Sequence, residues 1–408
     1  MTVHGRYVAK AFLFASATAL IGCSTPYEEL RFHGTDGGPA PEIVGIKQLL
    51  KINKQIDIMI IHGMCTHDSE WANKSIQGIA KQLAEGPVAP VTFTEVTGSK
   101  ARVYKRSLLL QDNSKVNISA IVWSPILTPL KEGLCYDQSV KTGICAKGED
   151  RPDFIEADIS SPAFKETRAS INRSLKDGLM DDCLADAIAY QGKAKEEISR
   201  QVQEAVLVAA TPSENVRSTD EVRTDAAARK DIPLVIHTAS LGSKVGFDAL
   251  NSLRQQGAEG EAAARSTIQR TSAIFMSANQ LPILQIADMS LTYGGAKGLA
   301  ADVPQDSLKV LLETYGPQIS LFQTNKGLPL GKQQPSDQPM VVVLSDPNDV
   351  LSYSLRNFKH RPDYVTVDVV VSNAPTWFGA FENPLKAHQD YLEQPNVVDL
   401  VVNGRKAD

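Results

Sequence analysis

Residues 232–244 (IPLVIHTASLGSK) constrain the fold of this chain more than any other segment. Residues 232–236 form a short apolar run of the kind found in a buried strand. The run ends at residues 238–242, and an amphipathic stretch follows at 244–254, which predicts a helix. A strand, a tight turn and a helix with Ser240 at the apex are typical of a strained turn that lifts a serine hydroxyl clear of a sheet. Many ordinary turns also contain Ser and Gly, so the match depends on the rest of the chain.

The chain alternates between strand-like and helix-like segments. Strands are expected at 56–61, 101–110, 116–123, 232–236, 271–276, 340–344 and 364–371, and helices at 69–85 (capped by Ser69), 165–191, 193–210, 244–254, 305–324 and 384–393. Residues 124–163 look irregular and residues 211–231 look like a polar connection. This alternation predicts an α/β fold with a mostly parallel sheet covered by helices on both faces. A hydrophobic content of 42% over 408 residues is enough for one elaborated domain with a large core.

The N-terminal residues predict export and lipid anchoring. Positive charge at Arg6 and Lys10 precedes an apolar run at 11–21. In a helix this run would span roughly 16 Å, too short for a hydrocarbon core of about 30 Å, so residues 1–22 are expected to be a signal peptide. The run ends in LIGC at Cys23, which looks like a bacterial lipobox, and the next residue is Ser rather than Asp. We therefore expect lipidation of Cys23, a flexible tether over 23–45, and a place in the bacterial cell envelope on the periplasmic side of the outer membrane.

The cysteines, the histidines and the net charge indicate which cofactors and partners to expect. Cys135 and Cys145 flank a polar span and are the favoured disulfide in an oxidising compartment, while the pairing of Cys65 and Cys183 stays open. The spacing of cysteines and of the seven histidines does not match a zinc site, so no metal and no cofactor are expected. A net charge of -5 without a basic stripe argues against nucleic acid as a partner.

A serine nucleophile needs a base and a group that orients the base, and in an α/β sheet such groups follow the carboxyl ends of strands. The strand at 340–344 is followed by Asp346 and Asp349. Asp349 is the favoured acid because the apolar Val350 and Leu351 after it can pin its loop, whereas Asp346 precedes a proline and suits a turn. His388 follows the next strand and is the expected base.

Other histidines are expected to have other roles. His360 precedes the last strong strand and should lie at the opposite end of the sheet, and His237 is expected to be a packed core residue. His67 is expected to be a polar loop residue, although a place in the pocket stays open. 

A negative charge that develops on a substrate oxygen needs backbone N–H donors. The N–H of Leu241 is one candidate. The second is the N–H of Met64, in the loop that follows His62 and Gly63.

With these residues in this order, the chain resembles the α/β-hydrolase family, specifically its lipase and esterase-like members. The resemblance rests on His62–Gly63, the turn at 238–242 closed by Gly242, and the order Ser240, Asp349, His388. It implies one hydrolase domain over 46–408, with cap-like insertions near 124–163 and 277–335. It also implies that His388 opens a C-terminal helix. Thr238 and Cys65 depart from the family pattern, because relatives usually have Gly at these positions.

The resemblance implies a serine hydrolase that cleaves carboxylic esters, including lipid esters, through an acyl-enzyme on Ser240. Thioesterase, acyltransferase and peptidase activities use the same groups and stay open. The alternative from another class is a non-catalytic envelope lipoprotein that uses the same scaffold for binding.

Overall fold

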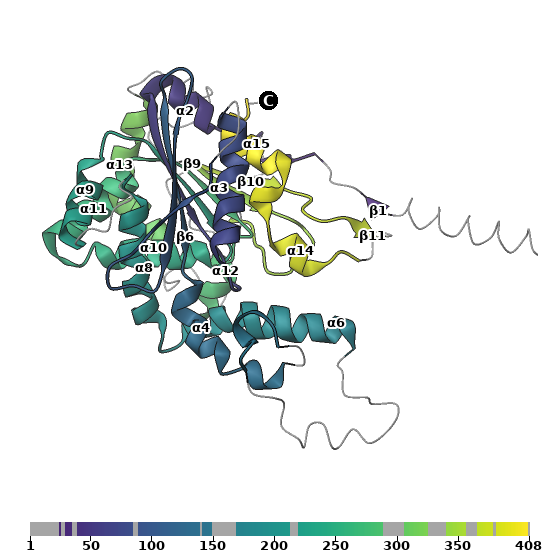
Figure 1. The fold of residues 1–408 in the computed structure, drawn as a ribbon. Coiled ribbons are helices and arrows are strands. Elements are labelled where there is room, and N and C mark those ends of the chain that lie inside the picture. Colours follow the sequence, from purple (N-terminus) through teal and green to yellow (C-terminus); the bar gives the residue numbers. More distant parts are fainter. Residues whose placement is uncertain are drawn as a thin grey trace, which may run out of the picture.

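The computed structural model describes residues 24–25, 29–34, 39–84, 89–138, 141–148, 169–212, 219–288, 306–324, 340–355, 365–377 and 381–406. At its centre is a nine-stranded mixed sheet with the strand order β2-β10-β9-β8-β7-β3-β6-β5-β4 (Figure 1). A separate two-stranded ribbon pairs β1 (Ser24–Thr25) with β11 (Thr376–Trp377). The predicted α/β class with a mostly parallel sheet is confirmed.

Six neighbouring strands of the large sheet run parallel, and the edges are antiparallel. The parallel strands are β10 (Val365–Val370), β9 (Met340–Ser345), β8 (Thr271–Ser277), β7 (Leu234–Ala239), β3 (Gln55–Ile61) and β6 (Lys115–Val122). The antiparallel strands are β2 (Arg31–His33), β5 (Arg102–Leu109) and β4 (Thr92–Thr94). The central strands β3, β7, β8 and β9 are mostly apolar, because helices cover the sheet on both faces and the side chains on both faces are buried.

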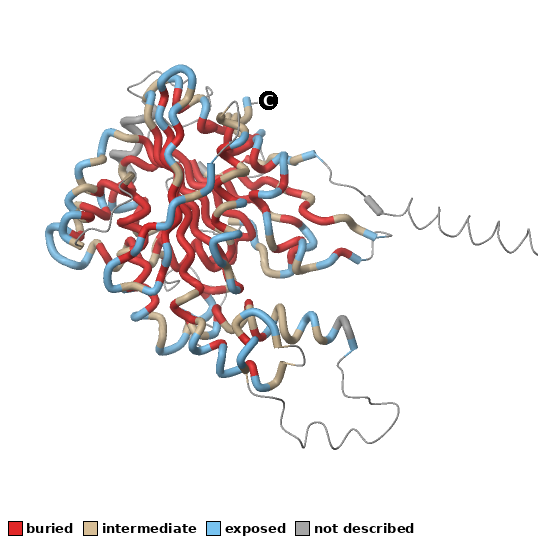
Figure 2. The backbone as a smooth tube through the Cα atoms, viewed as in Figure 1, coloured by how far each residue is buried: buried red, intermediate tan, exposed pale blue. Residues whose placement is uncertain are grey.

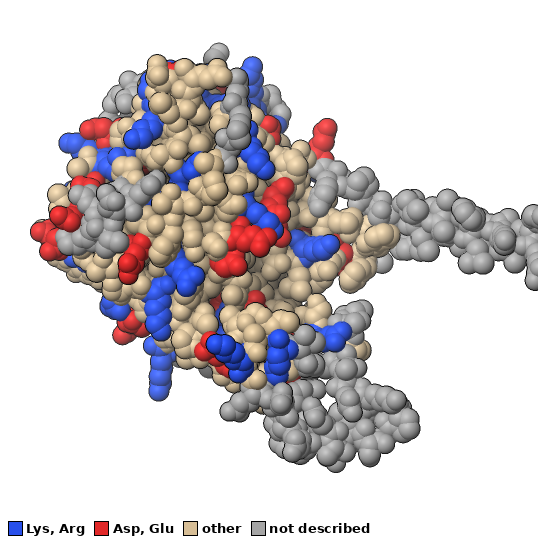
Figure 3. Space-filling view, in the orientation of Figure 1, with Lys and Arg blue, Asp and Glu red and all other residues tan. Residues whose placement is uncertain are grey.

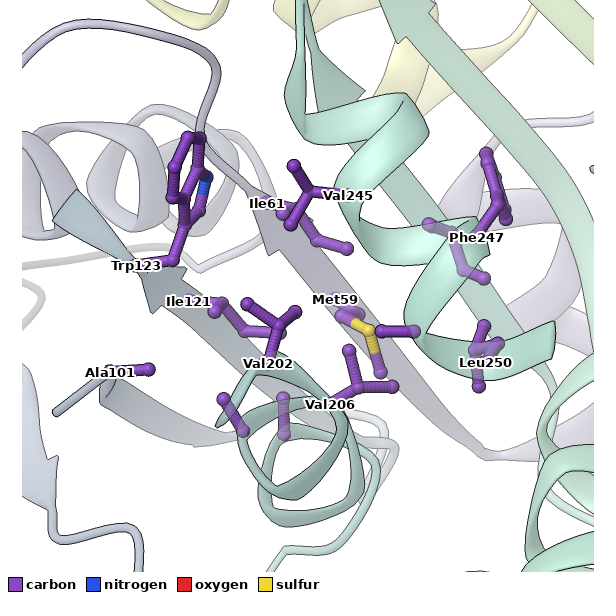
Figure 4. Close-up of a cluster of buried hydrophobic side chains, with 14 of the residues drawn as sticks. Met59, Ile61, Ala101, Ile121, Trp123, Val202, Val206, Val245, Phe247 and Leu250 are labelled. Atoms are coloured by element: carbon purple, nitrogen blue, oxygen red, sulfur yellow. The ribbon is translucent and has the colours of Figure 1, made fainter. Parts of the chain in front are cut away.

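Two groups of helices enclose the sheet. One face is covered by α2 (Ile46–Asn53), α3 (Ser69–Leu83) and α15 (Pro395–Asn403), and the other by α8 (Lys195–Ala209), α9 (Thr219–Ala228), α10 (Gly242–Leu253), α11 (Gly257–Gln269) and α13 (Ser307–Thr324). In Figure 4, Val202 and Val206 of α8 point toward Ile121 and Met59 of the sheet. This spacing of four residues places both valines on one helix face. Figure 2 shows the buried positions concentrated in the sheet and on the inward faces of these helices.

Shorter helices lie at the end of the sheet where the parallel strands terminate (Figure 1). They are α4 (Ser124–Glu132), α6 (Ser170–Arg173) with the π-helical segment Ser174–Leu184, α7 (Ala185–Gln191), α12 (Leu281–Leu284) and α14 (Pro384–His388). Single 3-10 turns occupy Cys135–Asp137, Gly143–Cys145, Gln285–Asp288 and Tyr391–Glu393.

Several expectations about the connections are wrong. The tether expected over 23–45 contains β2, which completes one edge of the sheet by pairing with β10. In the same segment, Ile43 is fully buried and pairs with Arg405. The polar connection expected at 211–231 contains α9, whose Val222 and Ala226 face the core.

The helices near the insertions also differ from expectation. Residues 124–132 form α4 rather than irregular chain. Helix α13, placed in the expected cap at 277–335, instead belongs to the core layer, because its Leu308 and Leu311 are buried against the sheet-covering helices. Asp68, not Ser69, caps α3, since its carboxylate accepts from the N–H groups of Glu70 and Trp71.

Some expectations fall on residues outside the described part of the chain. These are the signal peptide at 1–22, the lipidation site Cys23, His360, and the parts of the expected insertions at 149–163, 289–305 and 325–335. Among the described helices, none combines the length and apolar character needed to cross a membrane.

Candidate active site

Ser240 occupies the turn between β7 and α10 with a left-handed backbone, φ 51°. Only a few per cent of non-glycine residues adopt positive φ, and such strain is held in place by the surrounding structure. Here the Ser240 N–H donates to the Ser277 carbonyl of β8 at 2.8 Å. Gly242 has its α-carbon so close to β3 that an added Cβ would lie 2.2 Å from the His62 carbonyl oxygen. Only glycine therefore allows α10 to start this near the strand.

The residue at the start of the turn, Thr238, is compatible with this geometry. Its side chain is buried, and its Oγ1 lies 2.8 Å from Oγ of Ser243 in the first turn of α10. The two hydroxyl groups therefore join the strand to the helix. 

The structure brings Ser240, His388 and Asp349 together. His388 Nε2 lies 2.9 Å from Ser240 Oγ, and its Nδ1 lies 2.8 and 2.9 Å from the two carboxylate oxygens of Asp349. All three residues are buried, with exposed fractions of 3% for Ser240, 8% for His388 and 4% for Asp349. His388 ends the five-residue helix α14 rather than opening a longer one, so that detail of the expectation is wrong.

The loop that carries Asp349 is fixed at its far end by Asn279. The Tyr353 N–H donates to the Asn279 carbonyl, and Asn279 Nδ2 donates to the Tyr353 carbonyl, at 2.8 and 2.9 Å. Leu351 packs on the core as expected, but Val350 is 64% exposed. The acid loop is therefore held more by this reciprocal pair of hydrogen bonds than by apolar anchoring.

Asp346, the alternative acid, is not in contact with His388 but supports its loop. One Asp346 oxygen accepts from the Asn348 N–H, which forms the turn expected from the sequence. The other accepts from the Asn373 N–H at 2.6 Å, and the Asp346 N–H donates to the Tyr391 hydroxyl at 2.9 Å. Asp346 thus connects the acid loop with two residues that flank the His388 segment.

Asn373, which the sequence analysis missed, completes this connection. It follows β10, and its side-chain Nδ2 donates to the carbonyls of Lys386, Ala387 and Gln389 on either side of His388. One amide therefore fixes the backbone that orients the imidazole. A polar residue directly after a parallel strand was the only available signal in the sequence.

For any substrate that reacts at Ser240, we expect Asn373→Ala to lower kcat by about tenfold to a hundredfold with little change in KM, because a small displacement of His388 is costly. The measurement is steady-state kinetics beside a thermal melt. Asn403→Ala, which removes an exposed amide bonded to Asp399, is the matched control. Equal kinetics for Asn373→Ala and the control would contradict a positioning role.

Two backbone N–H groups are available beside Ser240. Within the described chain, neither the Leu241 N–H nor the Met64 N–H donates to a protein acceptor. Leu241 directly follows Ser240, and Met64 lines the cleft that also contains Ser240 and His388. These are the donors expected from the sequence, and their free N–H groups suit a developing oxyanion.

The loop that carries Met64 is held by His62 and by a disulfide. His62 Nδ1 donates to the Gly63 carbonyl at 2.7 Å, and its Nε2 accepts from the N–H groups of Trp123 and Ser124. Burial lowers the pKa of His62 well below its usual value, which keeps the ring neutral as these bonds require. Cys65 has φ 77° and is bonded to Cys183 in the π-helical segment.

Gly63 allows this loop to approach the serine. An added Cβ would lie 2.6 Å from the Ser240 Cβ and 2.9 Å from the Ala239 carbonyl oxygen. We expect Gly63→Ala to lower kcat/KM by about a hundredfold, because either the loop that carries Met64 or Ser240 itself must move. Kinetics on a soluble ester measure this. Gly178→Ala is the control, since its new Cβ would make only an ordinary 3.8 Å contact with Leu385. Full activity in Gly63→Ala would show that the loop is not confined against Ser240.

Ser240 and His388 line an open cleft. Its lining includes His67 and Trp71, and also Asp390 and Leu392, which follow His388 in the chain. The expectation of a loop position for His67 is therefore incomplete. Burial lowers the pKa of His67 to about 4, so its ring is neutral at pH 7, and its Nε2 lies 3.1 Å from the Met64 carbonyl. Figure 3 shows Lys and Arg interspersed with Asp and Glu on the face drawn.

The described residues hold one group with the spacing of metal ligands, Cys65, Asp182 and Cys183. Both of its sulfurs are used in the Cys65–Cys183 disulfide, which removes them as thiolate ligands. A second disulfide joins Cys135 to Cys145, the pair that the sequence favoured.

Comparison of the chain with protein-family models, with curated proteins and with solved structures gave no match.

Proposed function

We propose that this protein is a serine hydrolase of the α/β-hydrolase type that cleaves carboxylic esters. The observation that carries the proposal is the chain of contacts from Ser240 Oγ to His388 and from His388 to Asp349, all below 3 Å. The positions of the three residues after β7, β9 and β10 support the hydrolase fold, because loops at the carboxyl ends of parallel strands converge.

In the proposed reaction, Ser240 Oγ attacks the ester carbonyl carbon while His388 Nε2 takes the hydroxyl proton. Asp349 holds the Nδ1–H of His388 and stabilises the imidazolium. The carbonyl oxygen becomes an oxyanion that accepts from the N–H groups of Leu241 and Met64.

The intermediate then collapses, and the carbon–oxygen bond to the alcohol breaks. His388 gives its proton to the leaving alcohol, and the acyl group stays on Ser240. Water attacks the acyl-enzyme as His388 takes a proton from it. The acid leaves, and the proton returns to Ser240.

We also propose that the protein is held in the bacterial cell envelope by a lipid anchor on Cys23. Esters of the surrounding membrane are then among the candidate substrates. The support is the apolar run and the LIGC sequence at its end. Metabolic labelling with an alkyne fatty acid tests it: wild type should be labelled and Cys23→Ala should not.

A panel of short-chain and long-chain carboxylic esters, thioesters and amides tests the proposed activity. We expect wild-type protein to hydrolyse the carboxylic esters and Ser240→Ala to be inactive on all of them. A faster reaction with thioesters or amides would change the substrate class. No turnover by folded wild type would favour the non-catalytic binding role.

A further inference from the structure

His237 lies three residues before Ser240 on the inner wall of the same cleft. Side chains alternate across a strand, so His237 and Ala239 face one side of β7 while Thr238 faces α10. His237 is 2% exposed, and Ser75 of α3, which also lines the cleft, is 4% exposed. His237 therefore belongs to the deep end of the cleft rather than to its mouth.

Among the described residues, only one of the two ring nitrogens of His237 has a hydrogen-bond partner. Nε2 lies 3.0 Å from Ser277 Oγ on β8. Nδ1 is buried and has no hydrogen-bond partner among the residues that the structure describes. A buried polar atom without a partner costs about 1–3 kcal/mol, and an apolar side chain at this position would avoid that cost.

The chemistry of the ring limits what can bind it. Burial lowers the pKa of His237 to about 3, so the ring is neutral in solution at pH 7 and does not attract an anion by charge. If Ser277 donates to Nε2, the ring proton is on Nδ1 and Nδ1 is a donor; if Ser277 accepts from Nε2–H, Nδ1 is an acceptor. A hydroxyl group, which both donates and accepts, satisfies either state.

We propose that His237 Nδ1 binds a hydroxyl group of the substrate at the inner end of the cleft. The ligand class is an ester that carries a free hydroxyl near the scissile carbonyl, on its acyl or its alcohol part. This inference rests on the proposed hydrolase function, because it assigns a substrate group to the same site. It makes His237 a specificity residue in addition to its contact with β8.

Two pairs of esters of equal size test the inference. One pair compares p-nitrophenyl 3-hydroxybutanoate with p-nitrophenyl 3-methylbutanoate, which places a hydroxyl or a methyl on the acyl part. The other compares ethylene glycol monobutanoate with propyl butanoate, which makes the same exchange on the alcohol part. We expect wild type to favour the hydroxylated member of at least one pair by tenfold or more in kcat/KM.

Two variants separate the nitrogens of the ring. His237→Gln keeps a polar group that can reach Ser277 but removes the one at Nδ1, and we expect it to lose the preference. His237→Asn keeps a polar group at the Nδ1 position and gives up the Ser277 contact, and we expect it to keep part of the preference. If His237 had only a structural role, each substitution would lower kcat/KM by the same factor for both esters of a pair.

The same four esters are titrated by calorimetry into Ser240→Ala protein with and without His237→Gln. This measures the preference as a ratio of Kd values even if the wild type hydrolyses none of the esters, so failure of the proposed function and failure of this inference are distinguishable. Equal affinity within both pairs would overturn the inference and assign Nδ1 to a structural water. A preference unchanged in His237→Gln would also overturn it.

Discussion

Replacing His388 with alanine is expected to lower kcat/KM for ester hydrolysis by about 10⁴-fold or more, with the fold retained. Without the imidazole, none of the described residues offers a group within hydrogen-bond distance of Ser240 Oγ that can take its proton, and measured losses in other triads reach this size. The measurement is steady-state kinetics on a chromogenic ester, with circular dichroism to verify folding. His33→Ala, which changes a histidine of the edge strand β2, is the control and should keep wild-type activity.

The same assay distinguishes the two acids. Asp349→Asn should lower kcat by about 10³- to 10⁴-fold, because an amide at this position favours the wrong tautomer of His388. Asp346→Asn should have a smaller effect, since Asp346 contacts Asn373 and Asn348 rather than the imidazole. A larger loss in Asp346→Asn than in Asp349→Asn would reverse the assignment of the acid.

Replacing Asp57 with alanine is expected to destabilise the protein by about 3–5 kcal/mol, the usual effect of removing one partner from a buried ion pair. Asp57 is 3% exposed and accepts from Arg270, Arg229 and Asn117, each at 2.8 Å. Arg270 is fully buried. Burial lowers the pKa of its guanidinium, and the Asp57 carboxylate opposes that shift. Without Asp57, two arginines share a buried site with no carboxylate between them.

Chemical denaturation of wild type and Asp57→Ala measures this difference in the free energy of unfolding. The control is Glu70→Ala, which breaks the ion pair with Lys74, where the side chains are 73% and 51% exposed. Surface pairs contribute about 0–1 kcal/mol, so this variant should remain close to wild type. If both variants lost the same small amount, Asp57 would not be the centre of a buried network. Asp57 lies in the first half of β3, away from the Ser240 end, so residual activity of the folded variant should be near normal.

The predictable part of the fold follows from apolar runs and turn residues. The strand at 56–61 and the strand before Ser240 are recognisable because a parallel strand buried on both faces needs a mostly apolar sequence. The edge strand β2 was missed because its three residues, Arg31–His33, carry no such pattern and are placed by pairing with β10. Helix α9 was missed for a similar reason, since only Val222 and Ala226 of a mostly polar segment face the core.

In the candidate site, too, some residues are predictable from the sequence and others are not. Ser240 is predictable from the turn residues at 238–242, and Asp349 and His388 from their places after later strands, because a parallel sheet collects the loops after its strands at one edge. The supporting contacts depend on backbone geometry that no pattern shows. Asn373 binds three carbonyls around His388, and Asn279 binds the end of the acid loop. The free Nδ1 of His237 likewise becomes visible only when its neighbours are known.

The central claim is that Ser240 is an activated nucleophile, and labelling with a fluorophosphonate probe tests it most directly. Folded wild-type protein is expected to take up one probe per chain, and peptide mass spectrometry should locate it on Ser240. Heat-denatured protein and Ser240→Ala should remain unlabelled, and His388→Ala should react far more slowly. Folded wild-type protein that stays unlabelled, or that carries the probe on another residue, would contradict the account.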